Sequence, residues 1–226
     1  MTTLRVAIAG ALLYYLVISG ALKWSAILEL VKAWQSTGAA LVLLATALVL
    51  TAWRLCVLLR PAGFHLSLVA SVRLTLIGTF FNTCMLGSGG GDVVRIYYAT
   101  LGNVGRRTEV VTVMLLDRVA GLFALMLWPL LVILPLRTPL TSNPVVAGLL
   151  ASAAAIALAI AALLTIALSG NFKDSRLVKG TLEILPGGGY LRRALETVHS
   201  YKAGRVALAK AVGISLIAHT VAMLAT

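Results

Sequence analysis

Six apolar stretches of 17 to 25 residues recur along this chain of 226 residues. They are residues 6–22, 39–59, 66–86, 110–134, 144–168 and 206–226. A helix needs about 20 apolar residues to cross a hydrocarbon layer about 30 Å thick, so these runs have the length of membrane spans. We therefore predict an all-α fold, a polytopic integral membrane helix bundle, with residues 1–226 forming a single membrane domain.

The composition excludes a soluble globular domain. Apolar residues make up 60% of the chain and charged residues 12%, where soluble domains have about 50% and 25%. The 19 Lys and Arg residues outnumber the 7 Asp and Glu residues, for a net charge of +12. In a soluble chain this would suggest nucleic acid, but membrane proteins retain cationic loops on the cytoplasmic side. We expect no nucleic-acid partner.

Motifs of soluble enzymes and metal sites are absent from the sequence. Cys56 and Cys84 lie in apolar runs and match no zinc spacing, and the three histidines are far apart. There is no P-loop, HExxH or GxSxG pattern. We expect no cofactor, no bound metal and no catalytic residue of these kinds.

Polar segments separate the apolar runs. Residues 23–38 combine charge with apolar residues at helical spacing and predict a helix in the membrane interface. Residues 170–205 carry seven basic residues and should be cytoplasmic, with an amphipathic surface helix over about 191–201. Because the chain stops inside the last apolar run, we expect it to be truncated at its C-terminus.

The basic residues also bear on the orientation of the chain. If every run crosses the membrane, the better orientation places 12 Lys and Arg inside and four outside. If residues 66–86 instead enter and return, the N-terminus is cytoplasmic and the count becomes 13 to three. We adopt the re-entrant arrangement, which agrees with the glycine-rich segment that ends this run.

That glycine-rich segment, Gly87 to Gly91, cannot continue a helix cheaply, since each Gly costs about 1 kcal/mol relative to Ala. One interpretation is a helix start, with Asp92 as its N-cap. The other is a phosphate site formed by the backbone N–H groups of Gly89, Gly90 and Gly91 with nearby arginines. Those arginines are Arg95, Arg106 and Arg107.

Asp117 interrupts an apolar run about 12 Å along its helix, deep in the hydrocarbon layer. An aspartate at this depth needs a partner, and Arg118 is a poor one because consecutive helical residues point about 100° apart. Opposite charge suggests that Asp92 pairs with Arg118, and that Arg95 or Arg73 pairs with Asp117. The alternative to a functional site is a purely architectural ion network.

Two further features concern contacts between helices. Arg54 and Arg60 stand six residues apart, and we interpret them as anchors that both reach one water interface. The small residues Ala120, Gly121 and Ala124 follow Asp117 and would allow another segment to approach closely.

The chain resembles the flippase-like transmembrane domain of lysylphosphatidylglycerol synthases and its stand-alone bacterial and archaeal relatives. The resemblance depends on four sequence segments: Phe81-Asn82-Thr83, the glycines of Gly87 to Gly91, Asp92-Val93-Val94-Arg95, and Leu116-Asp117-Arg118-Val119-Ala120-Gly121. Two departures are visible. Met85-Leu86-Gly87-Ser88 replaces a Leu-Pro-Gly-Gly type of run, and the chain ends before the last spans of the family domain.

The resemblance implies a multi-pass protein of the bacterial or archaeal cytoplasmic (inner) membrane. In the synthases this domain is thought to move aminoacylated phosphatidylglycerol between leaflets, while a separate soluble domain makes the lipid. No stretch of the 226 residues resembles that soluble domain, so we lean away from an enzyme. Expected partners are anionic or other phosphate-bearing lipids and a separate synthase or lipid-pathway enzyme.

We therefore expect a protein that binds a charged lipid and assists its transfer between leaflets. The expected lipid-binding or translocation residues are Asp92, Arg95, Asp117, Arg118, Arg73, Gly89, Gly90 and Gly91. Two alternatives remain open: a membrane transferase for a lipid-linked substrate, with Asp92 or Asp117 as its base, and a scaffold subunit that transports nothing.

Overall fold

A computed structural model describes most of the chain. The described residues are 14, 18, 32–84, 90–101, 104–136, 143–168, 193–194, 196–198, 201 and 205–226. These residues form helices and their connections, which confirms the all-α fold class. The first apolar run, most of the interface segment 23–38 and most of the polar segment 170–205 lie outside the described residues.

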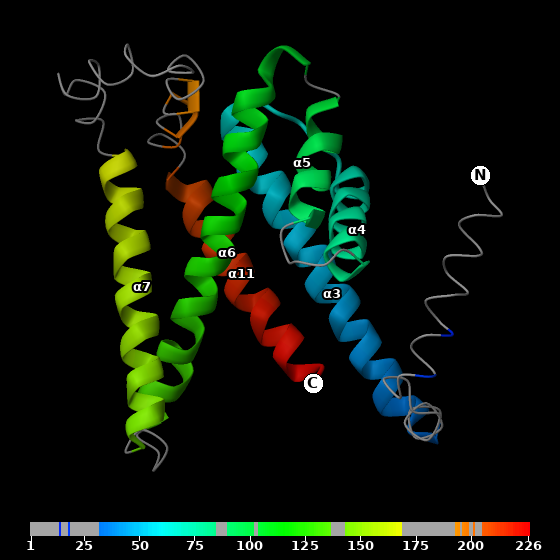
Figure 1. Ribbon diagram of the computed structural model, residues 1–226, viewed down its shortest axis with the longest axis vertical. Helices are drawn as coiled ribbons and strands as arrows, with labels where there is room; N and C mark the ends of the chain where they lie inside the picture. Colours follow the sequence, from blue (N-terminus) through cyan, green and yellow to red (C-terminus); the bar gives the residue numbers. More distant parts are fainter. Residues whose placement is uncertain are drawn as a thin grey trace.

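Four helices of the described part are long and apolar enough to cross a membrane. They are α3 (Trp34–Leu59), α6 (Arg107–Leu136), α7 (Pro144–Leu168) and α11 (Arg205–Leu224). In Figure 1, α3 and α7 run from the lower to the upper end of the molecule, and α6 and α11 run downward. Antiparallel α3 and α11 form the most extensive helix contact, and α7 packs against α6.

Two shorter helices, α4 (Leu68–Cys84) and α5 (Gly90–Leu101), pack against each other as an antiparallel hairpin. Figure 1 shows their adjoining ends between the two ends of α3, not at either one. The open end of the hairpin lies at the top, where η1 (Arg60–Ala62) precedes α4 and η2 (Val104–Arg106) follows α5.

Glycines determine how closely α4 and α5 approach. A Cβ on Gly91 would collide with the carbonyl oxygen of Gly78 and lie 2.6 Å from the amide of Asn82. Asn82 Oδ1 also accepts a 2.9 Å hydrogen bond from the Gly91 N–H. The start of α5 is therefore capped by a side chain of α4. Asp92 is the third residue of α5, so its predicted place as the N-cap is wrong.

The upper half of the bundle holds the apolar core. Leu55, Leu58 and Val113 are fully buried there, together with Tyr201, whose hydroxyl donates a hydrogen bond to the Leu58 carbonyl oxygen. Burial, with a further contribution from the charge of Asp117, raises the pKa of the Tyr201 hydroxyl well above its ordinary value. The hydroxyl therefore stays protonated and remains a donor.

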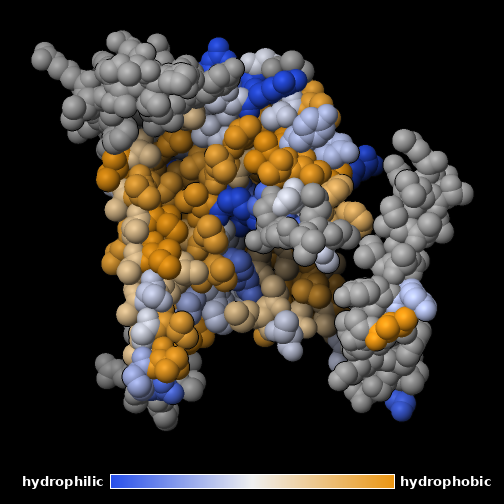
Figure 2. Space-filling view, in the orientation of Figure 1, coloured by the Kyte–Doolittle hydropathy of each residue, from blue (hydrophilic) through white to orange (hydrophobic). Residues whose placement is uncertain are grey.

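The outer surface is apolar over much of its height. Figure 2 shows hydrophobic side chains along α6 and α7, and hydrophilic surface beside the α4–α5 hairpin. Large side chains such as Leu149, Leu158 and Leu163 are more than 60% exposed on α7. A soluble protein rarely leaves such patches uncovered, whereas lipid covers them in a membrane.

We predict that Gly91→Ala destabilises the protein by about 1–3 kcal/mol, because the new methyl group has to displace the backbone of Gly78. Gly148→Ala on α7 is the matched control, since a Cβ at Gly148 meets nothing within 4 Å. Thermal unfolding in detergent measures both. Equal melting temperatures for Gly91→Ala and wild type would contradict the close contact of α4 and α5.

Candidate functional site: a buried arginine–aspartate network

Asp117 on α6 is fully buried and is held by an arginine from α3. Arg54 Nε donates to Asp117 Oδ1 at 2.7 Å, and Arg54 Nη2 donates to Oδ2 at 3.0 Å. Two parallel charge-assisted bonds of this kind are the strongest pairing available between a guanidinium and a carboxylate. The pair therefore fixes the register of α3 against α6.

Arg95 on α5 contacts the same carboxylate from another direction and is 3% exposed. Its Nη1 donates to Asp117 Oδ2 at 3.4 Å, and its Nη2 donates to the hydroxyl of Thr75 at 3.3 Å. Both bonds are long compared with those of Arg54. The buried Nε of Arg95 has no hydrogen-bond partner within the described part of the chain.

A third helix contact completes the surroundings of Arg54. Its Nη1 donates to Ser215 Oγ on α11 at 2.8 Å. On α6, a Cβ at Gly121 would lie 2.9 Å from this same Nη1, so only glycine leaves the guanidinium its present space. His219 Nε2 of α11 also lies 3.3 Å from the Gly121 carbonyl oxygen. Polar contacts thus join α11 to both α3 and α6.

A second ion pair lies beside this network. Arg118 Nη2 donates to Asp92 Oδ1, which links the next residue of α6 to the first turn of α5. The side chains of Arg118 and Asp92 are 44% and 27% exposed, so this pair lies at the surface of the described bundle. In contrast, the three side chains of the Arg54–Asp117–Arg95 network are each at most 7% exposed.

The two ion pairs expected from opposite charge, Asp92 with Arg118 and Arg95 with Asp117, are both present. Arg73, the other candidate for Asp117, is exposed on α4. The interpretation of Arg54 as a surface anchor is wrong, because this side chain points into the bundle and is 6% exposed. Arg60, which follows α3, is exposed and does not share the buried side of Arg54.

The glycine-rich segment contributes less to the site than the sequence suggested. Gly89 lies outside the described residues, Gly90 is half-buried, and the Gly91 N–H is taken by Asn82. Arg106 does not join this segment: it donates to the Ala62 carbonyl oxygen at 2.7 Å and stacks on the Phe64 ring at the far end of α5.

The sequence analysis did not predict four polar contacts of the candidate site, which are made by Arg54, Thr75, Asn82 and Ser215. Each is a polar residue inside an apolar run, and this is the signal that could have found them. The small residues after Asp117 do allow close packing. Ala120 and Ala124 are buried, and the missing side chain of Gly121 leaves space for the Arg54 guanidinium.

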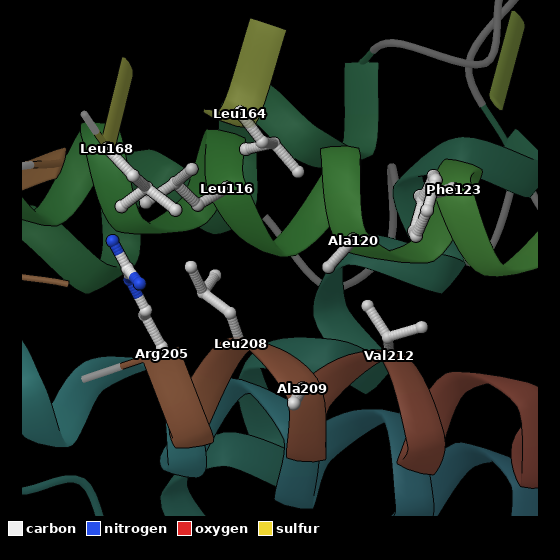
Figure 3. A pocket seen from close by; sticks show the side chains of 9 residues that line it. All are labelled: Leu116, Ala120, Phe123, Leu164, Leu168, Arg205, Leu208, Ala209 and Val212. Atoms are coloured by element: carbon white, nitrogen blue, oxygen red, sulfur yellow. The ribbon is translucent and has the colours of Figure 1, made fainter. Parts of the chain in front are cut away.

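The apolar groove in Figure 3 offers no such chemistry. It has a volume of about 170 Å³ and lies between α6, α7 and α11. Arg205, at one end, is the single charged side chain among the nine that line it. The described residues likewise contain no cluster of His, Cys, Asp and Glu that could hold a metal ion. The charged network is therefore the candidate site.

We predict that Arg54→Gln destabilises the protein by about 3–5 kcal/mol, because it leaves the buried Asp117 carboxylate with only the longer Arg95 contact. Adding Asp117→Asn to Arg54→Gln should recover part of this loss. The free energy of unfolding of the two single variants and of the double variant is measured by denaturant unfolding followed by circular dichroism. Strict additivity of the two single changes would contradict the pairing.

The more exposed pair provides the matched comparison. Asp92→Asn with Arg118→Gln should cost about 0–1 kcal/mol, the usual range for solvent-exposed ion pairs. If this double variant loses as much stability as the double variant of Arg54→Gln with Asp117→Asn, burial does not distinguish the two pairs.

Comparison with known proteins relates the chain to a protein family. No curated protein and no solved structure matches the chain significantly. A family model described as "Lysylphosphatidylglycerol synthase TM region" matches residues 3–226, nearly the whole chain and all the residues of the network. The chain is therefore a membrane protein that belongs to the lysylphosphatidylglycerol synthase transmembrane-region family.

Proposed function

We propose that this protein binds a phosphate-bearing lipid at the buried network and assists its transfer between the two leaflets. Membership of a family related to lipid synthesis and flipping gives the general direction. The specific proposal depends on the charge balance of the network and on the state of Arg95.

The observation that carries the proposal is a surplus of buried positive charge. The salt bridges of Arg54, Arg95 and Asp117 bring two guanidinium groups to one carboxylate. Burying a charge without a partner is costly, so the network favours an additional anion. The Nε–H of Arg95 also finds no acceptor among the residues that the structure describes. A lipid phosphate supplies both the negative charge and acceptor oxygens.

Arg54 and Arg95 have different roles in this proposal. Arg54 holds Asp117 with short bonds and also holds Ser215, so it keeps the helices in register. Arg95 makes only long bonds, so it can exchange Asp117 for a phosphate oxygen at little cost. Arg118 follows Asp117 on α6, and its exposed pair with Asp92 would contact the lipid headgroup first.

We propose that α4 and α5 form a re-entrant hairpin whose open end is cytoplasmic. The cytoplasmic assignment follows from the basic residues, which gather at the upper end of the bundle: Arg60, Arg106, Arg107, Arg205 and Lys210. This arrangement would place Arg95 inside the membrane while keeping it in reach of cytoplasmic lipid headgroups. It retains the proposed inner-membrane location and the cytoplasmic loop 170–205.

The orientation is tested with single cysteines in a background without Cys56 and Cys84. Gly105→Cys lies at the upper end, before α6, and Asn143→Cys lies at the lower end, before α7. An impermeant thiol reagent applied to intact cells should label position 143 and not position 105. The opposite labelling would reverse the proposed orientation, and labelling of both would rule out a fixed topology.

The transfer is tested with labelled phosphatidylglycerol in reconstituted vesicles. Arg95→Gln should abolish transfer between leaflets, whereas Arg95→Lys, which keeps the charge, should retain part of it. Neutralising Arg192 and Arg193 together is the control: it should weaken lipid association in a salt-dependent way without abolishing transfer.

Two outcomes would contradict the proposal. If Arg95→Gln is folded and transfers lipid as fast as wild type, the network is not the transfer site. If the wild-type protein moves no lipid while a host lipid pathway still depends on its presence, the scaffold function takes its place. Product formation from a lipid-linked substrate and a donor would instead favour the transferase.

A further inference from the structure

A lateral groove between α3 and α11 lies apart from the buried network. Its volume is about 680 Å³, much larger than the 170 Å³ groove of Figure 3. Trp53, Val57 and Arg60 line it from the α3 side, at the spacing of one helix face, and Lys210, Gly213 and Ile217 line it from α11. Arg54 and Leu58, by contrast, face the bundle interior.

The hydrogen bond between Arg54 and Ser215 fixes the relative height of the two groove walls. Arg60 follows Arg54 by six residues, and Lys210 precedes Ser215 by five. Because the helices are antiparallel (Figure 1), both cations lie above that bond, by about 9 Å and about 7.5 Å at 1.5 Å per residue. Trp53 and Ile217 lie near the level of the bond itself. The groove therefore has a cationic upper part and an apolar lower part.

The cations of the groove, Arg60 and Lys210, are free to bind an anion as far as the described residues show. Arg60 and Lys210 are both exposed, and neither belongs to a salt bridge within the described part of the chain. Arg60 directly follows α3 and lies near the end of the membrane-length span Trp34–Ala62, which is where lipid headgroups begin. Below it the groove is open, because a Cβ on Gly213 would meet nothing within 4 Å.

We propose that the α3–α11 groove is a binding site for an anionic phospholipid, whose phosphate lies between Arg60 and Lys210 and whose acyl chain lies along Val57, Trp53 and Ile217. Charge complementarity selects an anionic headgroup over a zwitterionic one, and the apolar lower part excludes a soluble phosphate ester. This inference goes beyond the proposed transfer function, since a lipid held here does not have to cross the membrane.

Trp53 provides a probe inside the groove. In a variant with Trp24, Trp34 and Trp128 replaced by Phe, its fluorescence is measured in phosphatidylcholine vesicles that contain phosphatidylglycerol brominated on its acyl chains. Brominated phosphatidylcholine is the comparison. Each cation near the surface favours anionic lipid by about fivefold. Half-maximal quenching should therefore need at least a fivefold lower mole fraction of the anionic lipid. Equal quenching by both lipids would overturn the proposal.

Two test variants, each with a control, locate the site. The double variant of Arg60→Gln with Lys210→Gln should remove the preference for the anionic lipid. Its control, Arg107→Gln, changes an exposed cation at the same end and should leave the preference unchanged. Gly213→Leu should fill the groove and weaken quenching by the anionic lipid at least fivefold, while Gly148→Leu on α7 should not. A preference that survives the double substitution, or unchanged quenching in Gly213→Leu, would also overturn the proposal.

A second measurement keeps all four tryptophans. Native mass spectrometry counts the phosphatidylglycerol molecules that stay bound to wild type and to the Arg60→Gln, Lys210→Gln variant. The double variant should retain fewer bound molecules, and equal numbers would contradict the site. Leaflet transfer, which is assigned to Arg95, should persist in this variant, so the two proposals fail separately.

Discussion

One buried carboxylate organises the bundle. Asp117 accepts hydrogen bonds from Arg54 of α3 and Arg95 of α5, and Arg54 extends the contact to Ser215 of α11. Four helices, α3, α5, α6 and α11, thus meet around one side chain. A charge in a membrane interior is tolerated only with partners, so each of these helices is constrained in rotation and depth. Apolar packing alone would leave many such arrangements nearly equal in energy.

The close contact of α4 and α5 follows from the same constraint. Arg95 reaches Asp117 because its helix lies within backbone contact of α4, at Gly78 and Gly91. A Cβ on Gly78 would lie 3.4 Å from Arg95 Cβ and 3.3 Å from the Gly91 carbonyl oxygen. The glycines therefore act here by allowing approach, and Asn82 satisfies the N–H that this approach leaves at the start of α5. A phosphate cradle formed by the backbone is not needed to explain Gly91.

Cations occupy three different environments in the described part of this protein. Arg54 is structural, because its bonds to Asp117 are short and fully buried. Arg95 is in contact with the same carboxylate, and its Nε–H has no acceptor among the described residues, which is the property that a binding residue needs. Arg60 and Lys210 face outward, where they can act on lipid without affecting the core. Side chains of the same charge therefore differ in burial and in their hydrogen bonds, and this difference is the basis of the separate roles that we propose for them.

The sequence by itself determined the class, the helices and part of the site. Apolar length predicted the membrane spans, with α7 beginning and ending at the expected residues, and opposite charge predicted the partners Asp92–Arg118 and Arg95–Asp117. The tertiary structure decided that Arg54 turns inward and Arg73 outward. Both arginines interrupt apolar helices of low amphipathicity, so no polar face indicates their direction. Which side of such a helix meets Asp117 depends on how α3, α4, α6 and α11 pack, and the one-dimensional pattern of a single helix does not contain that information.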